Sequence, residues 1–278
     1  MQHATGVGHA HRGTSVICTV RDGARYIRAA LASALSSSIQ ELIVVDDGST
    51  DETLTILGEL SRAEPRLRVI PSVPVGRGQA MALALRECHG DAVVNIDADD
   101  VLHPDWIRIG RHILDTHPEV AVVAASPRYV SVDENVTWAS SAVHEPLVRD
   151  VTALVAFYNP IVHSSAMLRR SALNAVGGYD GARRTHVDYD LWIRLAGAGW
   201  RLAVAQAPLV AKRLHQGQHF ERGHHLSYLW ASARVQVQGI RAVHGGMSAW
   251  ASLVGRLVWG LLPRSVRMFA RRLIADRL

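Results

Sequence analysis

The sequence predicts an α/β protein built on one mostly parallel β-sheet flanked by helices. Short apolar runs alternate with segments of helical periodicity through the first half of the chain. Strands that alternate with helices need crossover connections, and these place neighbouring strands parallel. Polar residues gather directly after several of the apolar runs, where open α/β sheets bind ligands. The 278 residues, 48% hydrophobic and 20% charged, suffice for one large domain with an appendage.

Each element follows from its local pattern. Apolar runs bounded by polar residues predict strands at Ser15–Val20, Glu41–Val45, Leu67–Ile70, Ala92–Ile96 and Val120–Ala125. Apolar residues at helical spacing predict helices at Ala24–Ser37, Asp51–Arg62, Gly78–Cys88 and, beginning at a proline, Pro104–His117. The second half is less regular. There we expect helices at Val151–Tyr158 and Asp188–Ala198 and extended segments at Ser165–Leu168, Leu202–Ala205 and Leu209–Arg213.

Three regions are expected along the chain. Residues 1–13 contain histidine and glycine but no apolar signal-peptide core, which indicates a disordered arm. Residues 14–220 would form the α/β domain, and residues 221–278 a helical C-terminal extension. The two cysteines, Cys18 and Cys88, lack metal-binding spacing and are expected to be buried free thiols in a reducing cytoplasm.

Three carboxylates follow one apolar run within four residues: Asp97, Asp99 and Asp100. They repel one another unless solvent or a cation compensates their charge. Hard oxygen ligands of this kind suit Mg²⁺ or Mn²⁺, which often bind through one or two carboxylates and the phosphates of a substrate. The alternative is a helix cap with solvated side chains before Pro104.

A second acidic cluster, Asp46-Asp47-Gly48-Ser49, follows another apolar run. A fixed carboxylate there can accept hydrogen bonds from the NH of a base or from ribose hydroxyls, and the glycine permits a tight turn. The alternative is a capped turn, since Ser49 can begin the next helix.

Five runs carry a resemblance to a known family. In chain order they are VICTVRDGARYIRAALAS, ELIVVDDGSTDET, VGRGQAMALAL, CHGDAVVNIDADDVLHPDWI and VDYDLWIRLAGAGW. Together they resemble glycosyltransferase family 2, whose members have the GT-A fold, over about residues 14–217. The resemblance implies an inverting enzyme that moves a sugar from a nucleotide diphosphate donor to a hydroxyl acceptor, with Mn²⁺ or Mg²⁺ as cofactor.

On the donor side, the resemblance assigns roles by position. Thr19 and Asp47 match positions that hold the base and ribose, and Asp46 belongs to the same nucleotide-sugar-binding turn. Arg77 matches a position near the base and phosphates.

The metal end of the donor site is assigned in the same way. Asp97, Ala98 and Asp99 form the DXD motif; the first two are assigned to the donor, and Asp99 with Asp100 to the metal. His215 resembles a late histidine that reaches the metal in some members, and imidazole can ligate Mn²⁺. The alternative for His215 is a structural or solvated side chain.

On the acceptor side, Asp188 matches the catalytic base, which takes the proton of the attacking hydroxyl. Val187 replaces the glutamate that usually precedes this base, which puts the support of the base or the acceptor in doubt. Asp190 is expected to be an exposed helix residue. Two further stretches, Ile161–Ala166 and Gly177–Asp180, resemble the segment leading to the acceptor cleft.

The C-terminal region is basic and partly apolar. Net charge is +5, and Lys212 is the only lysine. Ala249–Leu262 is apolar except for Arg256 but shorter than the ~20 residues that span a bilayer. Residues 263–278 contain five arginines and one aspartate. That segment would either lie on an anionic membrane or pack on protein. We expect a cytoplasmic protein, which the first of these two roles would place at the inner face of the plasma membrane.

Other functional classes lack their marks. An oxidoreductase would show G-x-G-x-x-G after the first strand, which is absent. No basic-aromatic pattern predicts nucleic-acid binding. A non-catalytic nucleotide-sugar or glycan-binding module should lose the DXD carboxylates or the base, and both are present. We expect a UDP-sugar donor, with GDP- or dTDP-sugars as alternatives, and a surface glycan, lipid-linked sugar or small metabolite as acceptor.

Overall fold

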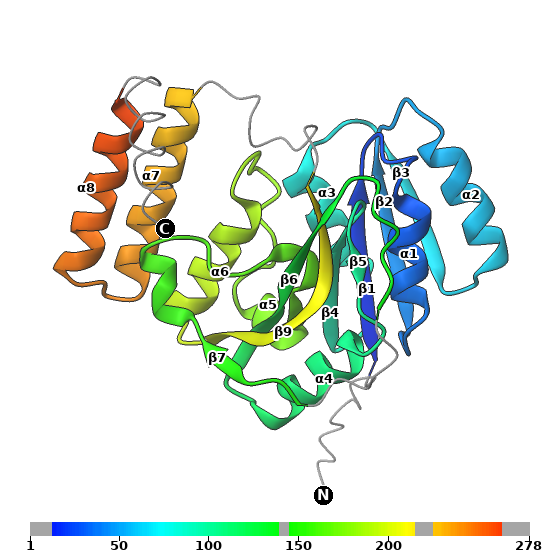
Figure 1. Ribbon diagram of the computed structural model, residues 1–278, viewed down its shortest axis with the longest axis horizontal. Helices are drawn as coiled ribbons and strands as arrows, with labels where there is room; N and C mark the ends of the chain where they lie inside the picture. Colours follow the sequence, from blue (N-terminus) through cyan, green and yellow to red (C-terminus); the bar gives the residue numbers. More distant parts are fainter. Residues whose placement is uncertain (1–12, 139–144, 215–224, 263–278) are drawn as a thin grey trace, which may run out of the picture.

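The computed structural model describes residues 13–138, 145–214 and 225–262. Its centre is a nine-stranded sheet with helices on both faces (Figure 1). The strand order is β3-β2-β1-β4-β8-β6-β9-β5, and β7 also pairs with β9. The predicted α/β architecture, including the helical C-terminal region, is confirmed. The boundary expected at residue 220 and the N-terminal arm fall on undescribed residues and stay predictions.

The strands and helices occur along the chain in the predicted order. The strands are β1 Thr14–Val20, β2 Glu41–Asp47, β3 Leu67–Ser72, β4 Ala92–Asp97, β5 Val101–Leu102, β6 Val120–Ser131, β7 Val148–Asp150, β8 Met167–Arg169 and β9 Arg201–Leu214. The α-helices are α1 Ile27–Leu35, α2 Thr53–Ala63, α3 Arg77–Arg86, α4 Trp106–Thr116, α5 Arg170–Ala175, α6 Val187–Gly197, α7 His225–Ala242 and α8 Met247–Leu261. Two 3₁₀ helices are η1 Thr152–Ala156 and η2 His163–Ser165.

The parallel part of the sheet is the part that positions the candidate site. β1 pairs in parallel with β2 on one side and with β4 on the other, and β2 pairs in parallel with β3. The register puts Thr19 opposite both Val45 and Asp97, and Val20 opposite Asp46. Residues from three separate sequence runs therefore reach the same carboxyl edge of the sheet.

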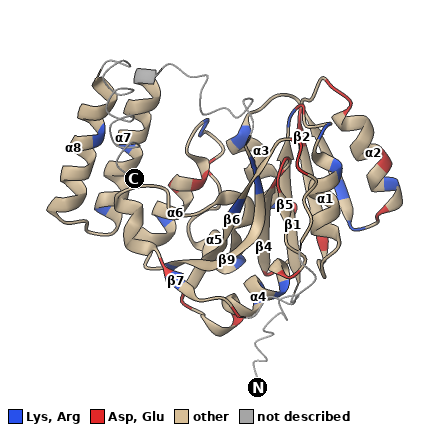
Figure 2. Cartoon of the chain, in the orientation of Figure 1, with Lys and Arg blue, Asp and Glu red and all other residues tan. Residues whose placement is uncertain are grey.

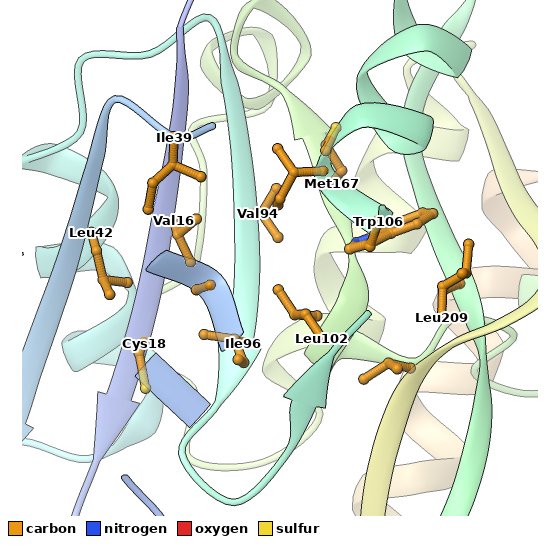
Figure 3. Packing of buried hydrophobic residues seen from close by; sticks show 14 of the residues in the cluster. Val16, Cys18, Ile39, Leu42, Val94, Ile96, Leu102, Trp106, Met167 and Leu209 are labelled. Carbon is orange, nitrogen blue, oxygen red and sulfur yellow. The ribbon is translucent and has the colours of Figure 1, made fainter. Parts of the chain in front are cut away.

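The apolar runs of the parallel strands are explained by burial on both faces of the sheet. Val16 and Cys18 of β1 pack with Val94 and Trp106 on one face (Figure 3). Ile17, between them in sequence, packs on the other face with residues of α3 and α6. Successive side chains of a strand point to opposite faces, so one continuous apolar run supplies both layers. Both cysteines are buried and free, as expected.

Two predictions about the second half differ from the structure in detail. Leu202–Ala205 and Leu209–Arg213 were expected as separate extended segments, but they belong to the single strand β9. Shifts in register opposite Ser126 of β6 let β9 continue through Pro208, because a bulge tolerates a residue that cannot donate to the ladder. Val151–Tyr158 contains a short 3₁₀ helix instead of an α-helix.

The two C-terminal helices pack against the sheet-containing part through η1 and α6. Gly239 of α7 sits so close to η1 that an added Cβ would lie 2.2 Å from the Val155 carbonyl oxygen. Gly260 of α8 similarly makes room for Leu229 of α7. The close approach depends on these glycines, and it joins the helical pair to the fold.

Asp190 in α6 was expected to be exposed, and this was wrong. Its residue exposure is 6%, and its carboxylate lies 2.5 Å from Arg183 Nη2 and 2.8 Å from Arg194 Nε. Helical periodicity could not show this, because Arg183 comes from the loop before the helix. The pair of arginines gives Asp190 a structural role.

We predict that Asp190→Asn destabilises the fold, because both arginines would lose their buried counter-charge. The arginines keep some solvent access, so we expect a loss of about 1–3 kcal/mol, below the value for a fully buried pair. Urea unfolding at neutral pH measures it. The control is Asp115→Asn, which removes an exposed helix-surface carboxylate. Equal unfolding free energies for the two variants would contradict the structural role.

Candidate active site

The first part of the site is the turn that follows β2. Asp47 accepts hydrogen bonds from the backbone N–H groups of Val75 and Gly76, at 2.6 and 3.1 Å to Oδ1. Gly76 has a φ of 88°, a conformation that glycine adopts without steric cost. Asp47 thus orders the loop that leads directly into Arg77 at the start of α3. Asp47 therefore stabilises this loop, and its contact with the nucleotide stays a prediction.

The neighbouring Asp46 keeps one carboxylate oxygen without a partner in the part of the chain that the structure describes. Its Oδ1 accepts a hydrogen bond from the Ser49 N–H at 2.7 Å, while its buried Oδ2 has no hydrogen-bond partner among the described residues. A buried acceptor without a partner is costly. An N–H group of a bound base would remove that cost.

Thr19 and Ala98 lie at the same edge. Thr19 Oγ1 lies 3.6 Å from Met81 Sδ of α3, so its hydroxyl has only a weak acceptor in the protein. Ala98 is partly buried and packs against the core. Both residues lie at the carboxyl edge of the sheet, and their contact with the donor stays a prediction.

Arg77 makes the central contact of the site. Its Nη2 donates to Asp97 Oδ1 at 2.6 Å and approaches His163 Nδ1 at 3.0 Å. Burial by itself raises the pKa of Asp97, but Arg77 and Lys212 together hold it well below its usual range. The carboxylate of Asp97 is consequently ionised and held against the guanidinium of Arg77.

His163 is held as a neutral ring by its neighbours. Its Nδ1 faces two nitrogen donors, on Arg77 and Asn95, so Nδ1 must be the acceptor. Its Nε2 then carries the proton and donates to Tyr179 Oη at 2.9 Å. Burial, with a further contribution from Arg77, lowers the pKa of His163 to about 4. The two stretches expected near the acceptor thus meet in one hydrogen-bond chain that ends on Arg77.

Lys212, the only lysine of the chain, lies at the end of β9 against the acidic cluster. Its Nζ is 3.0 Å from Asp100 Oδ2 and 3.5 Å from Asp97 Oδ2. Asp100 Oδ1 accepts the N–H of Arg213 at 3.0 Å. Burial raises the pKa of Asp100 to about 6, against the opposing effect of Lys212. In sequence Lys212 drew attention only as a compositional feature, because 112 residues separate it from Asp100.

The acidic cluster fits a divalent cation. Oxygens of Asp97, Asp99 and Asp100 all lie within 4.8 Å of one another, and carboxylate oxygens are the ligands that Mg²⁺ and Mn²⁺ prefer. Lys212 contacts two of the three carboxylates, so a cation bound there must share them with the ammonium or displace it. His215, the remaining predicted ligand, lies outside the described residues.

Asp188 lies at the beginning of α6, partly exposed. Asn159, which the sequence analysis did not single out, donates from Nδ2 to Asp188 Oδ2 at 2.7 Å. The charge of Asp188 contributes to raising the pKa of Arg77 and of Tyr179, after the larger effects of Asp97 and of burial respectively. The predicted base therefore lies within electrostatic reach of the donor residues.

The residue before α6 is held in an uncommon backbone conformation. His186 has a φ of 55°, the left-handed region that non-glycine residues rarely adopt. Its ring stacks on Tyr228, with centroids 5.0 Å apart, and its Nε2 lies 2.9 Å from Ser232 Oγ. Both partners belong to α7. The C-terminal helices thus help to set the start of the helix that carries Asp188.

Comparison with solved structures identifies the fold. The S. aureus TarS structure in complex with UDP-GlcNAc matches with a TM-score of 0.67 and 19% identity, covering 88% of this chain and 72% of that one. Mannosyltransferase PcManGT from Pyrobaculum calidifontis, in complex with GDP-Man and Mn²⁺, matches with a TM-score of 0.64 and 20% identity, covering 90% and 72%. These likenesses confirm the GT-A fold that the resemblance implied.

Comparison of sequences identifies the family. The putative glycosyltransferase EpsE of Bacillus subtilis is 28% identical over 263 residues, covering 91% of this chain and 90% of EpsE. Chondroitin synthase of Escherichia coli is 30% identical over 177 residues, covering 63% of this chain, which spans only a quarter of that protein. The model of the family "Glycosyl transferase family 2" matches residues 15–177, more than half of the sequence. The chain therefore belongs to glycosyl transferase family 2.

Proposed function

We propose that this protein is a metal-dependent, inverting glycosyltransferase that uses a nucleotide diphosphate sugar, with UDP-sugar as the expected donor. The observation that carries the proposal is the contact of Arg77 with Asp97 in the Asp97–Asp100 cluster, with Asp188 near enough to act on Arg77 electrostatically. Family membership supports it, as do two structural neighbours solved in complex with UDP-GlcNAc and with GDP-Man. Because the second neighbour was solved with GDP-Man, a GDP-sugar remains the alternative donor that we propose.

The proposed reaction is a single displacement. A divalent cation at the acidic cluster, held by Asp99 and Asp100, would supply positive charge for the leaving diphosphate. Arg77, fixed by Asp97 and His163, adds a second positive group at the same edge. Asp188 takes the proton of the acceptor hydroxyl, which attacks the anomeric carbon from the face opposite the leaving group. Attack from that face inverts the anomeric configuration.

We propose a surface glycan, lipid-linked sugar or small metabolite as the acceptor, and the cytoplasm as the place of reaction. Residues 263–278, the segment proposed to contact an anionic membrane, lie outside the described residues. Within the described ranges, no helix is long and apolar enough to cross a membrane. The alternative function, a non-catalytic module that binds nucleotide sugars, predicts donor binding without transfer.

We predict that Asp99→Ala abolishes transfer and removes the Mn²⁺ dependence of UDP binding, because it deletes a ligand from the cluster. Calorimetric titration of UDP with and without Mn²⁺ measures the second effect directly. Asp115→Ala, on an exposed helix surface, is the control and should keep the metal dependence. Metal-dependent binding that survives in Asp99→Ala would remove Asp99 from the metal site.

We predict that Lys212→Met tightens Mn²⁺ binding by the nucleotide-free protein. The ammonium contacts Asp97 and Asp100, so its removal takes away a competing like charge, an effect of about tenfold or more. Electron paramagnetic resonance of free Mn²⁺ during titration gives the affinity. Arg62→Met removes the same charge from an exposed site and should change nothing. Equal affinities in the two variants would show that Lys212 does not compete with the metal.

We predict that Asp188→Asn lowers kcat with nearly unchanged affinity for the nucleotide diphosphate. The substitution keeps the size of the side chain but removes the proton acceptor, and loss of a general base typically costs about 10²–10⁴-fold in rate. Steady-state kinetics and UDP titration separate the two effects. If the variant keeps more than about a third of the wild-type kcat, well above that range, Asp188 is not the base. Asp190 would not replace it, since two arginines occupy its carboxylate.

A further inference from the structure

Helix α8 exposes a continuous apolar stripe. Its members are separated by three or four residues, which places them on one side of a helix. They are Met247, Trp250, Val254, Val258 and Leu261, with exposed fractions of 89%, 43%, 58%, 56% and 59%. Single exposed apolar residues are ordinary, whereas a contiguous patch marks an interaction surface.

The orientation of the stripe is set by the opposite side of the helix. Ala249 and Leu253 are buried in a cluster with residues of α7, and Gly260 packs on Leu229. Arg256 donates from Nη2 to the carbonyl oxygen of Phe157. Figure 1 shows α8 at the outer edge of the molecule, beyond α7. The stripe therefore faces away from the rest of the protein.

The charge of the chain is unevenly distributed along the sequence, and the region that contains α8 is basic. Residues 222–278 contain nine arginines and a single acidic residue, Asp276, a net charge of +8, while the whole chain carries +5. The preceding 221 residues are consequently net negative, at −3. Figure 2 shows no acidic residue on α7 or α8, and their sequences contain none. Five of the nine arginines follow the end of α8 within residues 263–278.

This positive charge helps to decide which partner the apolar stripe binds, a second copy of the chain or a lipid surface. A second copy packed through α8 would bring its own basic helices against the first, and α7 and α8 together contain three arginines and no acidic residue to compensate them. An anionic lipid surface instead attracts each arginine near it. Tryptophan, present in the stripe at Trp250, favours the boundary between apolar and aqueous phases. The 15 residues of α8 span about 22 Å at 1.5 Å per residue, less than the ~30 Å of a bilayer core.

We propose that the exposed face of α8 docks on an anionic bilayer, with the helix lying in the interface and the stripe inserted among the acyl chains. The apolar side chains supply burial, and the net positive charge of the C-terminal region supplies attraction to the headgroups. This surface is distinct from the segment 263–278, which adds charge beyond the end of the helix. It does not depend on the transferase chemistry.

The test compares two double variants with equal charge changes. Val254→Asp with Val258→Asp places two carboxylates in the stripe. Ser248→Asp with Gly255→Asp places two on exposed positions about 100° around the helix from Met247 and Val254. A side chain at Gly255 meets open space. Since both doubles lower the net charge by two, only the loss of apolar insertion distinguishes them.

The measurement is sedimentation with vesicles of phosphatidylcholine and phosphatidylglycerol in equal parts, at low salt, without donor or metal. We expect the stripe variant to bind at least about tenfold more weakly than the control, because charge in the apolar face opposes insertion. Circular dichroism melts confirm that both variants fold. The same assay with phosphatidylcholine alone should show weak binding for every form.

Three results would overturn the docking surface. The first is equal vesicle binding by the two double variants, and the second is wild-type protein that ignores the anionic vesicles. The third is a lipid-free dimer that becomes a monomer only in the stripe variant, which would assign the stripe to a second copy. Because neither donor nor metal is present, none of these results bears on the proposed transfer reaction.

Discussion

The parallel pairing of β1 with β2 on one side and β4 on the other determines the site. That register brings Thr19, Asp46 and Asp97 to one edge although they come from three separate runs. Both faces of these strands are buried, and a slip of one residue would move every side chain to the wrong face. The core that stabilises the sheet therefore also determines where these three side chains lie.

Such convergence concentrates negative charge, and the fold compensates for it with cations from distant segments. Arg77 arrives from the loop that Asp47 holds, and Lys212 arrives from the end of β9. With both in place, Asp97 stays ionised despite its burial. The same compensation affects the binding of a divalent cation, because Asp97 and Asp100 already form ion pairs with Arg77 and Lys212. A metal that brings a diphosphate with it also brings new acceptors for the displaced ammonium.

The sequence predicted the local features well because their signals are local. A buried strand followed by a turn, as in Ala92–Asp97, is written in consecutive residues, and the family resemblance supplied the order of the motifs. Contacts between distant residues were not predictable in this way. Nothing near Asp188 in sequence indicates Asn159, and nothing near Asp190 indicates that Arg183 covers it. The continuity of β9 through Pro208 likewise depends on a bulge relative to its partner strand.

The C-terminal helices connect the two proposals. Tyr228 and Ser232 of α7 hold His186 in its left-handed conformation, two residues before Asp188. On its other side α7 packs on α8, whose apolar face we assign to the membrane. Docking of α8 on a bilayer would therefore also constrain α7, the helix that contacts the start of α6. Val187 stands where the family usually has a glutamate, so support of Asp188, the proposed base, must come from other groups. The structure provides the hydrogen bond from Asn159 and the contacts of His186 with α7.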